Sequence, residues 1–226
     1  MKIIREPIKN QVYNIIKNRI LNFEYNFGDP INITALTKEL DVSNTPVREA
    51  LSRLEAEGLV ISSYSSHVRV IELTEELIKE INEAVLSLEL GAYDFNLLTG
   101  KEESLIATLQ SALDRQEQNL TTDTSQDFIR SAIAFDKGFV QATENSRLIS
   151  TFESLEPILY MLTNYNYHQQ QVNKKNNLLE HKRILTAVKK AGELSDKMAV
   201  HKLLAQHYDK HIAENACLHT TGNPEI

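Results

Sequence analysis

The feature that most constrains the fold of this chain is the run of residues 41–60, which reads DVSNTPVREALSRLEAEGLV. Ser43 or Asn44 can cap the free amides that open a helix, and Pro46 is tolerated in its first turn. Apolar side chains recur at helical spacing, at Val47, Leu51 and Leu54. Gly58 favours the end of the helix because glycine readily adopts the left-handed conformation. The run predicts a short capped helix followed by a β-branched segment.

Two helical patterns precede this run, and a strand-like pattern follows it. Residues 7–23 and 31–40 carry apolar side chains at steps of three and four, so each predicts a helix. Those of the first helix are Ile8, Val12, Ile15, Ile16 and Ile20. Residues 60–71 are rich in Val, Ile and Ser and predict two strands around a polar tip. Three helices and a hairpin make a winged helix-turn-helix, which presents its third helix to the major groove of DNA.

The stretch Val42–Val60 resembles the recognition-helix signature of the GntR family of bacterial transcription regulators, including both arginines, Arg48 and Arg53. The rest of the chain resembles the FadR-like branch of that family, whose C-terminal half is an all-helical ligand-binding domain called FCD. The resemblance implies a sequence-specific DNA-binding regulator, a repressor controlled by a small metabolite in the helical domain. It implies a homodimer on double-stranded operator DNA, without enzymatic activity or catalytic residues.

The expected DNA contacts come from the third helix and the wing. Arg48 and Arg53 can pair with guanine edges or clamp phosphate. Ser43, Asn44 and Thr45 lie at the helix N-terminus, where their side chains and the free backbone amides can bind phosphate oxygens. By resemblance, the wing tip reaches the minor groove through Tyr64, Ser65, Ser66 and His67. The alternative for either arginine is an ion pair with a nearby acid, such as Glu49 or Glu55. The family usually has arginine in place of Asn44 and glycine in place of His67, which leaves the operator sequence open.

Helical periodicity continues from residue 75 almost to the end of the chain. It predicts six helices, at residues 75–98, 102–119, 124–142, 146–165, 174–191 and 194–215. The polar stretch 165–177 is expected to be a solvated loop. Six such helices predict an antiparallel bundle with a central cavity, so the fold class is mainly α. The expected domains are a winged helix-turn-helix at 1–73, an FCD-like effector-binding and dimerisation domain at 74–215, and a tail at 216–226.

The FCD resemblance also implies a metal site with an aspartate, a histidine four residues later and two further histidines. Asp136 keeps the acid and Val140 replaces the first histidine, while His181 and His207 match the other two. The incomplete set of Asp136, His181 and His207 can hold one divalent ion, Zn²⁺, Ni²⁺ or Mn²⁺, with waters in the open positions. In the alternative, all four positions line a metal-free pocket, and both histidines bind an organic effector directly.

Several other interpretations remain open at this point. Val85 stands where related sequences often place an arginine, and its loss removes a clamp for a carboxylate effector such as an organic acid. The two departures, Val85 and Val140, motivate a constitutive regulator with a decayed pocket. The cluster itself motivates a metal-dependent hydrolase. His211 lies one turn beyond His207, a spacing that can chelate metal, but no resemblance supports it and we expect it at the surface.

The charge of the chain is consistent with a DNA-binding first third. The net charge is −7, yet residues 1–73 hold nine basic and nine acidic side chains, so the acidity lies in the C-terminal half. A DNA-binding domain needs a local basic face and not a basic chain. The sequence has no apolar run that could span a membrane and no signal peptide. The single cysteine, Cys217, fits a reducing compartment, so we expect a cytoplasmic protein.

Overall fold

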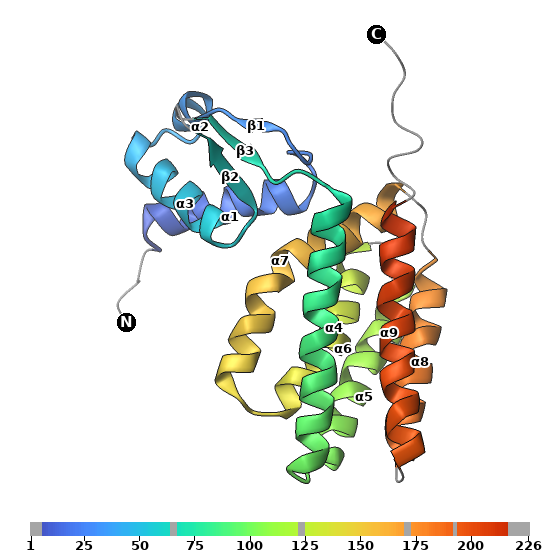
Figure 1. Cartoon of the computed structure of the whole chain (residues 1–226). Helices are drawn as coiled ribbons and strands as arrows, with labels where there is room; N and C mark the ends of the chain where they lie inside the picture. The colour runs from blue at the N-terminus through green and yellow to red at the C-terminus, as the bar shows by residue number, and fades with distance from the viewer. Residues whose placement is uncertain (1–5, 64–66, 122–124, 170–172, 192–193, 217–226) are drawn as a thin grey trace. The chain divides into compact units, whose positions relative to one another are not determined.

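The structure is a computed structural model that describes residues 6–63, 67–121, 125–169, 173–191 and 194–216. Within these residues the chain forms nine helices and three short strands, which confirms the mainly α class (Figure 1). The chain divides between Thr74 and Glu75 into two compact units, named here the winged unit and the helical unit. Three predicted wing residues, Tyr64, Ser65 and Ser66, lie outside the described residues, as does Cys217.

The winged unit contains three helices and a three-stranded sheet, which are α1 (Ile8–Leu21), β1 (Pro30–Ile31), α2 (Ile33–Glu39), α3 (Asn44–Ala56), β2 (Val60–Ser63) and β3 (His67–Val70). The sheet is antiparallel with the order β1-β3-β2. In its register Ile31 pairs with Val68, and Ser63 pairs with His67. His67 therefore begins β3, and the sheet ties the hairpin to the segment just before α2.

The start of α2 differs from the prediction, which began this helix at residue 31. Ile31 lies instead in β1, where its side chain is buried. Asn32 caps α2, because its Oδ1 accepts a hydrogen bond of 3.0 Å from the amide of Ala35. A strong cap and a sheet pairing thus outweighed the apolar periodicity at this boundary.

The core of the winged unit forms where α1 packs against α3. The predicted stripe of α3 is fully buried, at Val47, Leu51 and Leu54. In α1 the side chains of Val12, Ile16 and Ile20 are buried, whereas those of Ile8 and Ile15 are exposed, so the core uses only part of the predicted apolar pattern. Tyr13 takes part in the core instead. Gly58, with φ of +72°, ends the turn after α3 in a conformation that disfavours other residues.

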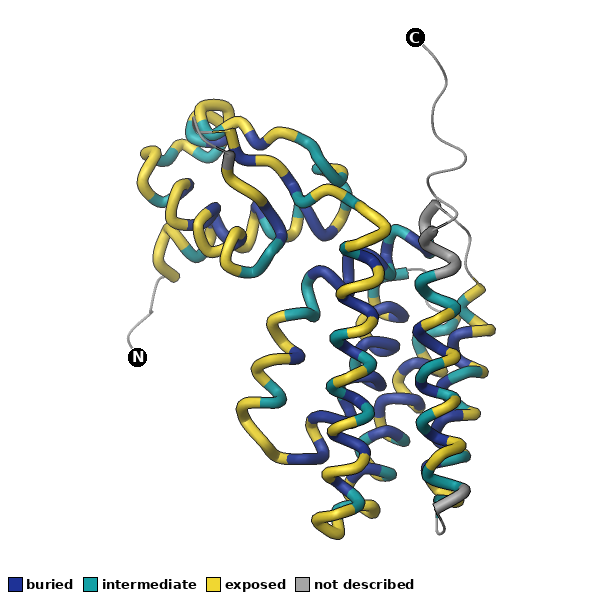
Figure 2. The backbone as a smooth tube through the Cα atoms, in the orientation of Figure 1, coloured by how far each residue is buried: buried dark blue, intermediate teal, exposed yellow. Residues whose placement is uncertain are grey.

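The helical unit is a bundle of six long helices, which are α4 (Glu75–Leu98), α5 (Glu102–Asn119), α6 (Ser125–Ala142), α7 (Ser146–Gln169), α8 (Lys174–Lys190) and α9 (Leu194–Ala216). In it, α6 packs against α4, α5, α7 and α8, while α9 packs against α4 and α8. Buried residues follow the inward side of these helices, and exposed residues follow the outward side (Figure 2). None of the described helices combines the length and the apolarity needed to span a bilayer.

The predicted polar loop at residues 165–177 is wrong for most of its length. Helix α7 continues to Gln169, and α8 begins at Lys174. Two amide side chains of this stretch are buried inside the bundle, those of Asn166 and Asn177. Tyr167 also packs edge-on against Phe128, with ring centroids 5.7 Å apart. Polar composition misled the prediction because these amides face an interior site and not solvent.

Candidate functional site

The N-terminus of α3 presents its polar side chains to solvent. Ser43, Asn44, Thr45 and Arg48 are all exposed. Ser43 occupies the N-cap position, but its side chain makes no capping hydrogen bond, so the helix does not use its hydroxyl. The opening amides of α3 therefore lie beside an exposed hydroxyl and an exposed guanidinium, a combination that suits phosphate.

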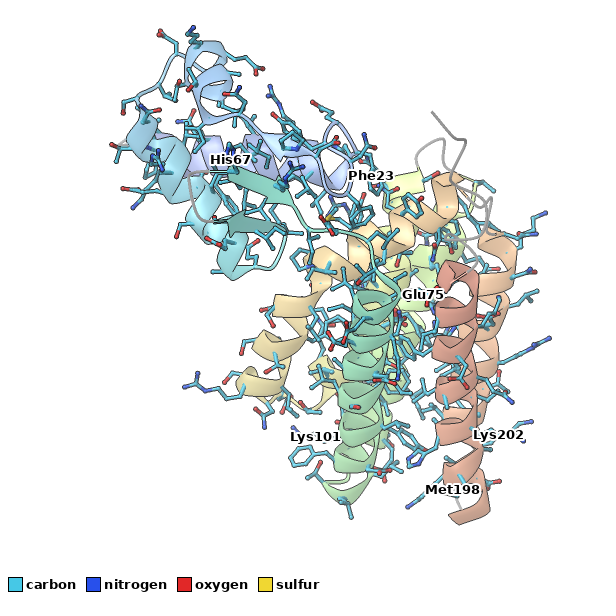
Figure 3. The ribbon with its side chains drawn as sticks, turned by 45° about the horizontal axis from the view of Figure 1, so that its top comes forward. Phe23, His67, Glu75, Lys101, Met198 and Lys202 are labelled. Atoms are coloured by element: carbon cyan, nitrogen blue, oxygen red, sulfur yellow. The ribbon has the colours of Figure 1, made fainter. Side chains whose placement is uncertain are left out.

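A groove of about 430 Å³ brings three of the predicted DNA-contacting residues together. Asn44 and Arg48 line it from α3, and His67 lines it from the start of β3 (labelled in Figure 3). The remaining lining comes from residues 30–34 and Val68. No acid in the described part of the chain forms an ion pair with Arg48, so its charge is directed at this open surface.

Arg53, in contrast, is held by α1. Its guanidinium carbon lies 3.7 Å from the ring centroid of Tyr13, and its Nε lies 3.3 Å from Glu57 Oε1. Glu57 also accepts hydrogen bonds of 2.7 Å from both Tyr13 Oη and Lys17 Nζ. Burial acts to raise the pKa of Glu57, but these donors outweigh it and the pKa is lowered. Arg53 therefore has an acidic partner, although it is Glu57 and neither of the two acids named from the sequence.

In the helical unit, three helices bring Asp136, His181 and His207 together from α6, α8 and α9. One donor atom from each lies within 4.8 Å of the others, and all three residues are buried. His181 Nε2 is 3.5 Å from Asp136 Oδ1. Val140 lies one helical turn after Asp136, and its side chain is fully buried, as is that of Val85 on α4.

A chain of hydrogen bonds fixes the ring of His181. Gln116 Nε2 donates to Asn177 Oδ1 at 2.6 Å, so the oxygen of the Gln116 amide is the atom that faces His181. That oxygen lies 2.8 Å from His181 Nδ1 and accepts its proton. His181 Nε2 then carries a lone pair, and this buried atom has no hydrogen-bond partner. This is the arrangement of a metal-binding histidine, whose other ring nitrogen is held by an acceptor.

His207 is oriented in the same manner by a carboxylate. Its Nδ1 donates to Glu180 Oε2 at 2.9 Å, and Lys210 Nζ donates to the other oxygen of Glu180. Burial acts to raise the pKa of Glu180, but the hydrogen bonds from His207 and Lys210 outweigh it and lower the pKa to about 2. Glu180 is therefore ionised, which directs Nε2 of His207 toward the cluster.

His211 is not at the surface, which corrects the prediction. Its Nε2 lies 3.2 Å from His207 Nε2, and the two rings meet edge-on with centroids 4.5 Å apart. Its side chain is half-buried, because the helical repeat of α9 turns it to the same side as His207. Burial, followed by the neighbouring charge of His207, lowers the pKa of His211 to about 3.

Two buried acids near the cluster have raised pKa values. Burial raises the pKa of Asp136 to about 7, and the charge of His207 offsets only part of this. Burial and then the charge of Asp136 raise the pKa of Glu89 well above its usual range. Tyr208 Oη donates to Glu89 at 2.6 Å. Each charged carboxyl group disfavours ionisation of the other, and a positive ion beside them would favour the ionised forms.

Sequence reasoning missed the residues that surround the cluster, which are Glu89, Gln116, Glu180 and Tyr208. Two of them carried a signal that could have been used. Glu89 stands four residues after Val85, on the apolar stripe of α4, where a carboxylate is unexpected. Glu180 directly precedes His181, but only the packing of α8 against α9 places it beside His207.

The cluster borders a small cavity of about 20 Å³, which has room for one water molecule or ion. Its lining includes Asp136, His207, Tyr208, His211 and the amide side chains of Asn82 and Asn166, and it contains no lysine or arginine. A buried carboxylate, a bare imidazole nitrogen and a second oriented imidazole are typical ligands of a divalent transition metal. The residues present therefore fit such an ion.

Comparison with known proteins gives consistent results for both units. A family model described as bacterial regulatory proteins, gntR family, matches residues 8–70, and the FCD domain model matches residues 80–210. The chain is 30% identical over 218 residues to the uncharacterized HTH-type transcriptional regulator YdhC of Bacillus subtilis (strain 168), covering 92% of this chain and 93% of that protein.

Two further relatives extend the comparison. The gluconate operon transcriptional repressor of Bacillus subtilis (strain 168) is 26% identical over 144 residues, which is 64% of this chain and 58% of that protein. The crystal structure of a putative transcriptional regulator GntR from Rhodococcus sp. RHA1 superposes with a TM-score of 0.73 at 18% identity, covering 93% of this chain and 98% of that one. This last likeness concerns the fold alone.

Proposed function

Because the chain belongs to the gntR family of bacterial regulatory proteins and carries a C-terminal FCD domain, we propose that it acts as a homodimeric repressor whose α3 helices read a palindromic operator. It is a DNA-binding transcription regulator with an effector-binding helical domain. Its relatives are transcription regulators, a class that is distinct from enzymes. The relative named as a repressor supports repression as the mode of action.

One observation carries the DNA-binding proposal, namely the open groove that Arg48 shares with Asn44 and His67. In the proposal, Arg48 pairs with a guanine edge in the major groove, while Ser43 and Thr45 bind phosphate at the start of α3. Arg53 contacts the DNA backbone from its place on the Tyr13 ring. The predicted wing residues 64–66 would extend this surface into the minor groove.

For the helical unit, we propose that Asp136, His181 and His207 hold one divalent ion, Zn²⁺, Ni²⁺ or Mn²⁺. The ion would supply a positive centre in a cavity whose lining contains no lysine or arginine. A small organic acid would then be the effector, because its carboxylate can complete the coordination of the ion. The fully buried Val85 and Val140 offer only apolar surface to a carboxylate. The ion would therefore be the main group that binds the carboxylate.

Regulation would follow from the small size of the cavity. A cavity of about 20 Å³ cannot hold a metabolite without a movement of the surrounding helices. Helices that move to admit the effector can change the spacing of the two winged units in the dimer. The effector changes DNA affinity because it binds one arrangement of the winged units more tightly than the other. The change cannot exceed this difference in effector affinity.

The DNA-binding proposal is tested by selecting operators from random duplex DNA with the full-length protein. The selected sites should be palindromic, and their binding, followed by fluorescence anisotropy, should weaken on adding a small hydroxy acid or sugar acid to the metal-loaded protein. Tight binding that neither a metabolite nor a chelator alters would favour the constitutive alternative. Failure to select any sequence would contradict specific DNA recognition.

The metal proposal is tested by elemental analysis of protein prepared without chelators or a histidine tag. Wild type should contain about one ion per chain, and His207→Ala should contain none. His201→Ala is a matched control, because His201 lies on the same helix but binds Asp94 at 2.9 Å. A metal-free wild type after exposure to Zn²⁺, Ni²⁺ and Mn²⁺ would contradict the proposal and point to an organic ligand bound directly by the histidines.

A further inference from the structure

Helix α9 carries two histidines at the cluster, although resemblance accounts for only one of them. His207 and His211 are one helical turn apart, and both line the small cavity beside Asp136. Their Nε2 atoms are 3.2 Å apart. Histidines at this spacing on one helix face can bind the same ion, because their side chains stack one above the other.

The separation of the two nitrogens fits shared coordination. Two imidazole nitrogens bound to one tetrahedral ion at bond lengths of about 2.0–2.1 Å are about 3.3 Å apart. The observed 3.2 Å is close to this value. It also resembles an ordinary hydrogen bond, in which His211 Nε2–H donates to the bare Nε2 of His207. Coordination replaces this hydrogen bond when the proton of His211 moves to Nδ1 and the lone pair of Nε2 turns to the ion.

The neighbouring α6 helix explains why a ligand from α9 is needed. Val140 follows Asp136 by one turn and is fully buried, so it offers only an apolar surface where the resemblance places an imidazole. The other acids near the cluster have partners already. Glu89 accepts a hydrogen bond from Tyr208, and Glu180 accepts from His207 and Lys210.

We propose that His211 supplies the third imidazole of the metal centre, so that the ligands are Asp136, His181, His207 and His211. The ligand lost from α6 at Val140 is thus replaced by one from α9. This inference rests on the metal centre proposed above. With His211 included, the ion would have four protein ligands. Any further coordination positions would be open to an effector or to water. This ligand set also attaches two consecutive turns of α9 to the ion.

The test is to count the imidazoles around the ion by X-ray absorption of the zinc-loaded full-length protein, which requires no variant. Wild type should show three imidazoles, His211→Ala should show two, and the control His201→Ala should again show three. Competition with a chromophoric chelator should show that His211→Ala binds Zn²⁺ at least about 10-fold more weakly, with His201→Ala unchanged.

The possible outcomes separate this inference from the metal centre itself. Two imidazoles in zinc-loaded wild type, or equal zinc affinity in wild type and His211→Ala, would overturn the role of His211 and leave the three-residue centre standing. Wild type that stays metal-free after exposure to Zn²⁺, Ni²⁺ and Mn²⁺ would refute the metal centre and, with it, the inference. Circular dichroism of the metal-free proteins verifies that His211→Ala is folded. If this variant is unfolded, the number of imidazoles around zinc in wild type decides the question.

Discussion

In the winged unit, Asn44 and Arg48 lie about one turn apart on α3, are exposed, and line an open groove with His67. In the helical unit, Asp136, His181 and His207 come from three helices and are buried. An exposed local surface can meet a macromolecule without a change in the fold. A buried cluster can respond only to a species small enough to enter, and it responds by moving the helices around it.

The two units also differ in the partners of their charged side chains. Arg48 faces an open groove, and its charge is available to phosphate or a base edge. Beside the buried cluster, the ionised carboxylate of Glu180 is instead matched by His207 and Lys210. The comparison teaches that the surface site depends on exposure, whereas the interior site depends on a chain of oriented hydrogen bonds.

Removing the exposed arginine should have the largest effect. In Arg48→Ala, operator affinity should fall by about 1–3 kcal/mol for each of the two half-sites, because a bidentate contact to guanine is lost. The fold should persist, since the side chain lies outside the buried stripe of α3. Anisotropy at a fixed salt concentration measures the loss, and the metal content should stay unchanged. Retained operator affinity would place the recognition surface elsewhere.

The next effect tests whether the interior site depends on oriented hydrogen bonds. Gln116→Leu keeps the volume of the side chain but leaves His181 Nδ1–H without its acceptor. Metal affinity should fall about 10–100-fold, as it does when a partner that orients a metal-binding histidine is lost. Gln110→Leu on the same helix is the control, because Gln110 is only partly buried and bonds Asp114 and Lys189. Unchanged affinity in Gln116→Leu, measured by chelator competition, would show that His181 needs no such support.

The third effect concerns acid stability in the winged unit. The pKa of Glu57 is lowered in the folded protein, so its bonds to Tyr13 and Lys17 stabilise the fold above the usual carboxyl pKa. This stabilisation is lost as the pH falls through the lowered pKa. At pH 7, Glu57→Gln should reduce the free energy of unfolding by about 1–2 kcal/mol. The deficit relative to wild type should shrink toward pH 3, as wild-type Glu57 is protonated in turn.

Urea unfolding of the full chain, followed by circular dichroism at both pH values, measures this difference. Glu55→Gln is the matched control, because Glu55 lies two residues before Glu57, in the last turn of α3, and its carboxylate accepts a hydrogen bond from the amide of Ser62. A deficit of equal size at pH 7 and pH 3 would show that the charge of Glu57 is not the cause.

The smallest effect should come from the second arginine of α3. Arg53→Ala removes the stacking on Tyr13, which is worth about 0.5–1 kcal/mol at an exposed position. Operator affinity should fall by less than about 10-fold, because Arg53 contacts the backbone at most and a phosphate contact carries no sequence information. Its loss should also reduce the salt dependence of binding slightly. If Arg53→Ala costs as much affinity as Arg48→Ala, the contrast between the two arginines fails.

The sequence by itself determined the features that depend on neighbouring residues. The helix at residues 44–56, its buried stripe and the six later helices all follow from local periodicity, and most predicted boundaries agree with the structure within a few residues. The short string around Arg48 also sufficed to indicate the family. These features are local because a helix is built from interactions between residues three and four apart.

Only the tertiary structure decided which polar residues are interior. It turned Asn166 and Asn177 from loop residues into buried ones, gave Arg53 a partner on α1, and brought His211 to the side of His207. Each of these contacts joins separate helices or depends on how one helix faces its neighbours. Periodicity gives the faces of a helix but not the partners they meet, so the buried cluster had to come from the packed bundle.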